Sequence, residues 1–231
     1  MTHSRISSFI SRALAISLLL VIGFIPSVAQ KKKKDVAQEA DTVALFRGVA
    51  VSADAVGLVQ LAVSSYGQYE AALRVNLKDK YFPIVELGYG QADATDFTTS
   101  MSYKTKAPYA RIGLDFNLLR NKHDIYRAYA GFRYGLTYYK FDVKGEGITD
   151  PVWGDEVPFS VTGVSANCHW MEGVFGVDAK IVGPLRLGWS VRYRFRIAHN
   201  DGTVGNTWYV PGYGKRGGTR LGGTFNIIFE I

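Results

Sequence analysis

The sequence contains little of what usually staples a fold or anchors it in a membrane. Cysteine occurs once in 231 residues, at Cys168, so no disulfide can form within the chain. We interpret Cys168 as a small packing residue. No apolar run reaches the roughly 20 residues that a membrane-spanning helix needs. The four histidines are dispersed relative to the carboxylates, so the sequence predicts no metal site and no cofactor.

Residues 1–29 have the features of a secretory signal peptide. Two arginines precede the apolar stretch Ala13–Ile25, and the small residues Ser27 and Ala29 precede a cleavage point at Gln30. The apolar stretch is too short to span a bilayer as a helix. A lipid anchor would require cysteine where Gln30 stands. We therefore predict an exported protein whose mature chain begins at Gln30.

The excess of positive charge lies mostly outside the predicted fold. Removal of the signal peptide with Arg5 and Arg12 lowers the formal charge of +7 by two, and Lys31–Lys34 supply four of the charges that remain. We predict that residues 30–43 form a basic periplasmic tail. The rest of the chain is nearly neutral, which argues against a nucleic-acid partner.

The clearest pattern in the chain lies at Leu185–Ile197, LRLGWSVRYRFRI. Every odd position in it is apolar, and the even positions carry four arginines, a glycine and a serine. Period two is the side-chain period of a β-strand, so one face of this strand is apolar and the other is polar. Such a contrast is typical of a strand with lipid on one side and a polar lumen on the other.

Seven other segments are interpreted as strands, and most are close to the roughly 9 to 11 residues that a tilted membrane strand needs. They are Leu45–Ala53, Tyr69–Leu77, Phe82–Gly90, Tyr109–Leu118, Tyr126–Phe141, Asn167–Ile181 and Arg220–Ile231. Six of them alternate in a similar way, whereas in Leu45–Ala53 the apolar residues Phe46, Val49 and Val51 do not share one parity. Residues 44–231 are therefore predicted to form an all-β fold, an eight-stranded antiparallel up-and-down transmembrane β-barrel.

The predicted connections alternate between short and long. The short ones are Asp79–Lys80, Leu119–Asp124 and Val182–Pro184, and the long ones are Asp54–Gln68, Gln91–Pro108, Asp142–Ala166 and His199–Thr219. Outer-membrane barrels have short periplasmic turns and long extracellular loops. With an even number of strands, both termini are expected on the periplasmic side.

Alternation alone does not separate a membrane barrel from a soluble barrel of the lipocalin kind, whose apolar face points inward. Two observations predict that the apolar face points outward. Glycines fall on the polar face, where a narrow lumen needs space: Gly88, Gly90, Gly113, Gly131, Gly135, Gly176, Gly188 and Gly222. The apolar face carries aromatic bulk that eight strands cannot enclose: Phe132, Tyr134, Phe175, Trp189, Tyr193 and Phe225.

On these patterns the chain resembles the small eight-stranded outer-membrane barrels of the OmpA and OmpX type, across Leu45–Ile231. It departs from them at Ile231, where they usually carry phenylalanine. The resemblance implies a location in the outer membrane of a Gram-negative bacterium, contact with membrane lipid and lipopolysaccharide, insertion by the barrel assembly machinery, and a monomeric state.

Charged residues on the polar face are predicted to form a network of salt bridges that closes the lumen, because eight strands enclose little more than side-chain volume. The predicted members are Arg74, Glu86, Arg111, Asp115, Arg127, Arg133, Glu172, Asp178, Arg192, Arg194, Arg196 and Arg220. Expected cross-strand contacts are Glu172–Arg194, Asp115–Arg127, Arg74–Glu86 and a cation–π pair of Trp170 with Arg196.

The sequence favours a structural or surface-interaction role. An enzyme modifying lipid A at the barrel rim and a narrow channel for small solutes remain alternatives. No spacing joins His123, His169 or His199 to a serine and an acid, so no catalytic residue is assigned. The aromatic residues Trp208, Tyr209 and Tyr213 are candidates for a contact made by a loop, or for anchoring at the headgroup level.

Overall fold

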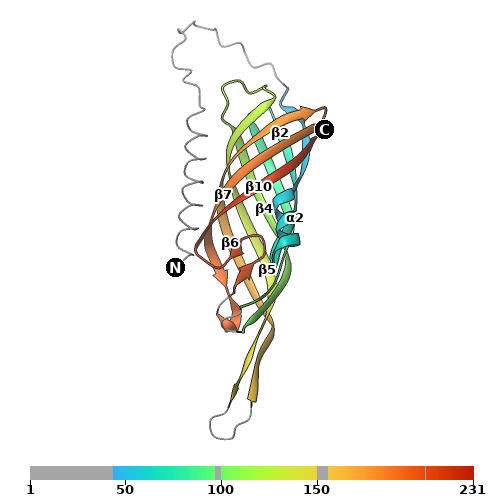
Figure 1. Ribbon diagram of the computed structural model, residues 1–231. Helices are drawn as coiled ribbons and strands as arrows, with labels where there is room; N and C mark the ends of the chain where they lie inside the picture. Colours follow the sequence, from blue (N-terminus) through green and yellow to red (C-terminus); the bar gives the residue numbers. More distant parts are fainter. Residues whose placement is uncertain (1–43, 97–99, 150–155, 206) are drawn as a thin grey trace, which may run out of the picture. The chain divides into compact units, whose positions relative to one another are not determined.

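The computed structural model describes residues 44–96, 100–149, 156–205 and 207–231. The predicted signal peptide and basic tail lie outside them. Eight strands form one closed antiparallel barrel in the order β1-β10-β7-β6-β5-β4-β3-β2, so each strand pairs with its neighbours along the barrel (Figure 1). They are β1 (Phe46–Asp54), β2 (Tyr66–Leu77), β3 (Tyr81–Thr95), β4 (Ser102–Asn117), β5 (Tyr126–Thr149), β6 (Glu156–Val182), β7 (Leu185–Asn200) and β10 (Thr219–Glu230). The predicted eight-stranded up-and-down barrel is confirmed.

Several strands run further than the sequence predicted. In the stretch Asp142–Ala166, expected as a loop, residues 142–149 and 156–166 continue the ladder of β5 and β6, with Val143 opposite Val161 and Thr149 opposite Glu156. Figure 1 shows this hairpin projecting beyond the rest of the barrel. The expectation failed because register shifts between Phe141 and Val143 and between Gly145 and Ile148 interrupt the period-two pattern of the sequence.

A helix replaces part of the first long loop. β1 ends at Asp54, and α2 (Ala55–Val63) follows. The carboxylate of Asp54 accepts hydrogen bonds from the backbone N–H groups of Val56 (3.0 Å) and Gly57 (3.2 Å), as an N-cap does. The sequence of α2, AVGLVQLAV, is apolar nearly all round and lacks the periodicity that identifies a surface helix. In the described part of the chain, no helix has the length and apolarity needed to cross a membrane.

The interior has two layers. Towards the short turns and the C-terminus, the inward positions carry buried acids and arginines. Towards the long hairpins, the same inward positions become aromatic and apolar, with Tyr103, Tyr109, Tyr139, Phe141, Trp170 and Cys168 all buried. Cys168 therefore packs as the sequence predicted.

A small hairpin between β7 and β10 folds into the mouth of the barrel. It consists of β8 (Tyr209–Val210) and β9 (Gly214–Lys215). The Tyr103 hydroxyl donates to the carbonyl of Tyr209 over 2.7 Å, and Tyr213 is fully buried. We call residues 209–215 the mouth hairpin. The expectation that Tyr209 and Tyr213 serve an outward contact or a headgroup anchor is wrong, because both rings fill the barrel mouth; Trp208 is partly buried beside them.

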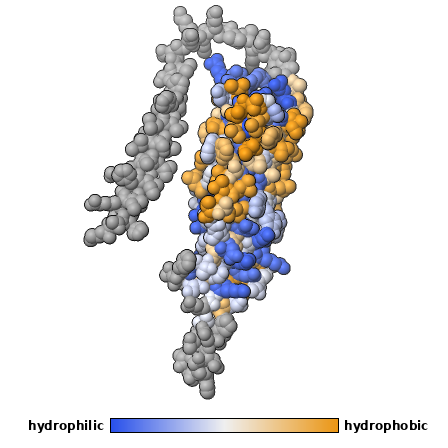
Figure 2. All heavy atoms as spheres, turned by 45° about the vertical axis from the view of Figure 1, so that its right-hand side comes forward, coloured by the Kyte–Doolittle hydropathy of each residue, from blue (hydrophilic) through white to orange (hydrophobic). Residues whose placement is uncertain are grey.

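The outer face of the barrel is apolar. Each of the eight wall strands exposes large apolar side chains on it, among them Val51, Leu73, Leu87, Ile112, Phe132, Phe175, Trp189, Tyr193, Leu221 and Phe229. Figure 2 shows apolar residues gathered over the half of the barrel that carries the C-terminus, with polar residues beyond it. The inward-apolar arrangement of a soluble lipocalin-like barrel is thereby excluded.

Glycines on the inner face make room for rings from the neighbouring strand. A Cβ atom on Gly176 would lie 2.4 Å from the ring of Tyr129, and one on Gly135 would lie 2.3 Å from the ring of Trp170. Real Cβ atoms do not approach other atoms this closely, so the rings lie flat against the glycine backbone.

Replacing one of these glycines should destabilise the barrel. Gly176→Ala is expected to lower the free energy of unfolding by about 1 to 3 kcal/mol, because Tyr129 cannot move away within a packed lumen. The measurement is urea unfolding in lipid vesicles followed by tryptophan fluorescence. Gly173→Ala on the same strand is the matched control, since a Cβ there meets nothing within 4 Å. Equal effects of the two substitutions would contradict the packing account.

Candidate functional site

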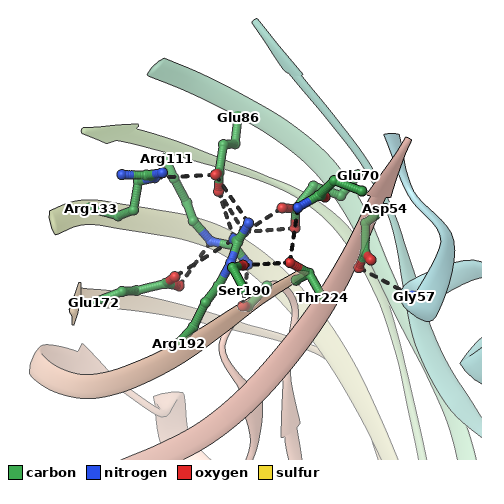
Figure 3. A network of polar contacts seen from close by, with 12 residues as sticks. Asp54, Gly57, Glu70, Glu86, Arg111, Arg133, Glu172, Ser190, Arg192 and Thr224 are labelled. Atoms are coloured by element: carbon green, nitrogen blue, oxygen red, sulfur yellow. Dashed lines mark hydrogen bonds and ion pairs between the residues drawn. The ribbon is translucent and has the colours of Figure 1, made fainter. Parts of the chain in front are cut away.

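The centre of the lumen holds two arginines that share the same three glutamates (Figure 3). Arg111 Nη1 lies 2.7 Å from Glu70 and 2.9 Å from Glu86, and its Nε lies 3.0 Å from Glu172. Arg192 Nη1 lies 3.1, 2.8 and 3.8 Å from the same three acids, in that order. These side chains come from β2, β3, β4, β6 and β7, so the cluster crosslinks most of the wall.

The contacts continue from this centre towards the short turns and the C-terminus. Arg133 bridges Glu86 and Asp115, at 3.2 and 2.7 Å. Arg74 then bridges Asp115 and Asp178, at 3.2 and 3.3 Å. Asp115 is fully buried, and both of its oxygens accept from Arg133. Each acid therefore has an arginine on either side.

The same alternation reaches the end of the barrel where the turns are short. Arg186 lies 2.7 Å from Asp178 and 3.5 Å from Glu230. Arg127 lies 2.6 Å from Glu230 and, more distantly, 3.9 Å from Asp79. We call the series from Asp79 to the central cluster the ion-pair chain.

Asp79 closes the ion-pair chain in the turn between β2 and β3. Its carboxylate lies 2.6 Å from His123 Nδ1, accepts from the Asn76 amide over 2.6 Å, and lies 3.3 Å from Arg47. Burial raises the pKa of a carboxyl group, but these hydrogen bonds and the charges of Arg47 and Arg127 lower it by more. The pKa of Asp79 therefore lies below its ordinary value.

Strict alternation of sign explains how so much charge is buried. A lone charge in a medium of low dielectric is strongly disfavoured, and breaking a buried pair leaves such a charge. Aromatic rings also stabilise the buried arginines. The guanidinium carbon of Arg74 lies 4.7 Å from the ring centroid of Tyr129, and the guanidinium carbon of Arg111 lies 4.7 Å from the ring centroid of Tyr109.

Two predicted cross-strand partners were wrong. Arg74 lies opposite Ile84 and not Glu86, and Asp115 lies opposite Gly131 and not Arg127. The turns set the register, and both turns differ in length from those assumed. Each error is an even number of residues, so all these side chains still face the lumen and find other partners. Glu172 does lie opposite Arg194, 3.1 Å from its Nε.

The predicted pairing of Trp170 with Arg196 was also wrong as a cation–π contact. The two residues lie opposite each other in the ladder. The guanidinium of Arg196, however, lies over Tyr213, 5.2 Å from its ring centroid. Trp170 instead donates from Nε1 to Glu172 over 2.7 Å. The mouth hairpin, which the sequence did not reveal, supplies the ring that Arg196 covers.

Arg196 and Arg220 lie outside the ion-pair chain, although both were predicted members. Arg196 donates to the carbonyl of Gly217 over 2.8 Å, and Arg220 donates to the carbonyl of Lys215 over 2.7 Å. Neither has a carboxylate within ion-pair distance in the described residues. Both arginines therefore hold the segment around the mouth hairpin.

Five residues of the ion-pair chain and its immediate contacts were not predicted: Arg47, Glu70, Asp79, Arg186 and Glu230. Glu70 and Arg186 occupy inward positions of strands that the sequence identified, so side-chain parity contains the signal for them. Arg47 and Asp79 lie at strand ends, where alternation gives no signal.

The described residues do not assemble a recognisable catalytic group. Ser190 is buried and shares a hydrogen bond of 2.7 Å with Thr224, and His169 bonds to the Tyr134 hydroxyl on the outer side. Within those residues no serine hydroxyl bonds to a histidine, and no group of three potential metal ligands occurs.

A family model matches nearly the whole chain. The matching model is the "Domain of unknown function (DUF6048)", and it covers residues 10–231. The chain belongs to the DUF6048 family. No curated protein matches this family member in sequence.

Among solved structures, the chain is similar to Neisserial surface protein A, with 14% identity and a TM-score of 0.43 over 80% of this chain and 99% of that one. It is similar to a major outer membrane protein from Thermus thermophilus, with 11% identity and a TM-score of 0.40 over 80% and 100%. Ail of Yersinia pestis, solved with the heparin analogue sucrose octasulfate, gives 10% identity and a TM-score of 0.36 over 79% and 93%.

Removing one central acid should destabilise the barrel severely. Glu86→Gln leaves Arg111, Arg133 and Arg192 with too little negative charge, and we expect the free energy of unfolding to fall by about 3 to 5 kcal/mol. Urea unfolding in vesicles measures the change. Asp93→Asn is the matched control: it breaks an ion pair with Lys104 whose side chains are both about two-thirds exposed, and should cost less than about 1 kcal/mol. A comparable loss in both variants would refute the central cluster.

The lowered pKa of Asp79 predicts that the free energy of unfolding depends on pH. Because the pKa of Asp79 is lower in the folded barrel than its ordinary value of 3.8, its ionised form stabilises the fold fully above that value. This contribution is lost as the pH falls through the folded pKa. The difference in unfolding free energy between wild type and Asp79→Asn should therefore be largest at neutral pH and shrink in acid. A difference that stays constant or grows on acidification would contradict this assignment.

Proposed function

We propose that this protein is an outer-membrane barrel with a closed lumen, acting as a structural or surface-interaction protein. The observation that carries the proposal is the inversion of polarity: apolar side chains cover the outside, and the ion-pair chain fills the inside. An apolar surface of this extent is incompatible with water and suits hydrocarbon.

The asymmetry of the two barrel ends supports an orientation. β1 begins and β10 ends at the end with the short turns, where the backbone N–H of Ile231 donates to the carbonyl of Val49 over 2.7 Å. The opposite end carries the long β5–β6 hairpin and the mouth hairpin. By the usual arrangement of such barrels, the first end would face the periplasm and the second the exterior.

A closed lumen is favoured over a channel. The central acids and arginines are almost completely buried, and their charges bond to one another and not to a water-filled path. Above them the mouth hairpin is held by Arg111 Nη2, which donates to the carbonyl of Gly212 over 2.8 Å. An ion crossing the barrel would have to displace both the central ion pairs and the mouth hairpin.

The β5–β6 hairpin is the best candidate for a surface contact. Its ladder extends to the pair Thr149–Glu156, well beyond the neighbouring strands, and the pairing keeps it extended. Lys140 and Lys144 are exposed along it. A stiff projecting ladder with free polar side chains suits recognition of another surface.

The test combines insertion with conductance. Purified protein reconstituted in vesicles should migrate faster on a gel before boiling than after it, as folded membrane barrels do. In planar bilayers it should give no stable ion-sized openings, because the lumen is filled. Recovery as a freely soluble protein without detergent would contradict the membrane location. Stable openings in the wild type would contradict the closed lumen.

A further inference from the structure

The eight strands close into a ring, but beside α2 part of the wall lacks strand pairing. We call this part the gap. β10 pairs with β1 only from Asn226 to Glu230, because β1 ends at Asp54. β2 likewise pairs with β1 only from Ala71 to Leu77. In the described residues no strand adjoins the remaining parts of β2 and β10 on this side, and α2 lies there instead (Figure 1).

The gap is a packed part of the structure and not a frayed strand end. Gly57 of α2 packs on the carbonyl of Gln68, where a Cβ would come within 2.6 Å, and Leu61 packs on Gly67 as closely. Asp54 also accepts from the backbone N–H of Phe225 over 3.2 Å, which ties β10 to the start of the helix. Unpaired strand edges are costly within a bilayer, because their backbone groups lack hydrogen-bond partners. A fixed gap in the wall is therefore a candidate binding site.

A cavity of about 290 Å³ lies at this gap. We call it the wall cavity. Its lining includes Gln68, Arg194 and Tyr213, which face the lumen, and Leu221, which is 74% exposed on the outside. The cavity is therefore open to a molecule that lies against the outer face of the barrel.

The wall cavity carries surplus positive charge. Lys215 and Arg220 line it, and neither has a carboxylate within ion-pair distance in the part of the chain that is described. The Lys215 ammonium lies 4.7 Å from the ring centroid of Tyr66. Arg194 is paired with Glu172. Asp54 is the acid in the lining, and its oxygens already accept backbone N–H groups.

The outer approach to the cavity is apolar. Val56, Leu58, Val59 and Val63 of α2 are exposed, and Val56 lines the cavity together with Leu221 of β10. Cations inside a polar cavity and an apolar surface leading to it together fit an amphiphile with an anionic head. Guanidinium and ammonium groups are the usual partners of phosphate.

We propose that the wall cavity binds the phosphate headgroup of a membrane lipid, with the acyl chains lying along α2 and Leu221. The lysine and arginine neutralise the phosphate, and the apolar helix covers the first part of the chains. This inference rests on the proposed location in a membrane.

The experiment is a native mass spectrometry titration of the full-length protein in detergent with dioleoyl phosphatidic acid and, separately, dioleoyl phosphatidylcholine. The two lipids share their chains and differ in the headgroup. We expect phosphatidic acid to bind at one site about tenfold more tightly. The variant Lys215→Gln/Arg220→Gln should lose this preference, and Lys215→Arg should retain it. The matched control Lys140→Gln/Lys144→Gln removes the same charge from β5 and should behave as wild type.

Three results would overturn the proposal: equal affinity for the two lipids, an unchanged preference in Lys215→Gln/Arg220→Gln, or displacement of phosphatidic acid by an equal concentration of inorganic phosphate. The last result would indicate a site for free phosphate. Heat-modifiable migration of every variant checks that it folds. If the protein inserts into vesicles but does not discriminate between the lipids, the lipid site in the wall cavity is refuted and the proposed function is not. If the protein does not insert, the proposed function itself is refuted.

Discussion

The structure depends on one constraint, that a charge at the centre of the narrow barrel must have an opposite charge in contact with it. Arg111 and Arg192 meet it by sharing three glutamates, and Arg133 and Arg74 pass the alternation on to Asp115 and Asp178. Because each acid contacts at least two arginines, a strand cannot shift without breaking several ion pairs. The charges therefore fix the relative positions of the strands, a task that apolar packing performs in most soluble proteins.

The lumen is closed by two different means. The ion-pair chain fills the half of the lumen nearer the short turns, while the half nearer the long hairpins is filled by aromatic rings and by the mouth hairpin. The layers meet where Arg111 and Arg194 donate to the carbonyls of Gly212 and Tyr213. These two bonds link the charges to the hairpin, so disturbance of one layer is expected to loosen the other.

Sequence alternation predicted the lumen-facing positions of the charged side chains, and the partner of Glu172, but not the partners of Arg74 and Asp115. Parity placed Arg74 and Asp115 in the lumen, yet their expected partners were wrong, because a slip of an even number of residues keeps the face and changes the neighbour. α2 escaped prediction because it is apolar on all sides. The mouth hairpin escaped because contacts between Tyr209 and distant residues such as Tyr103 leave no local signal. Those two elements create the wall cavity, so it could not be predicted.

The native thiol gives the most direct test of a dry, filled lumen. Cys168 is fully buried among the aromatic side chains, beside the mouth hairpin. The measurement is its reaction rate with a small, charged, thiol-specific reagent in folded protein and in urea. A closed lumen predicts no modification until the barrel unfolds, and prompt modification afterwards. Rapid modification of the folded barrel would mean that water reaches the interior, and would contradict the account.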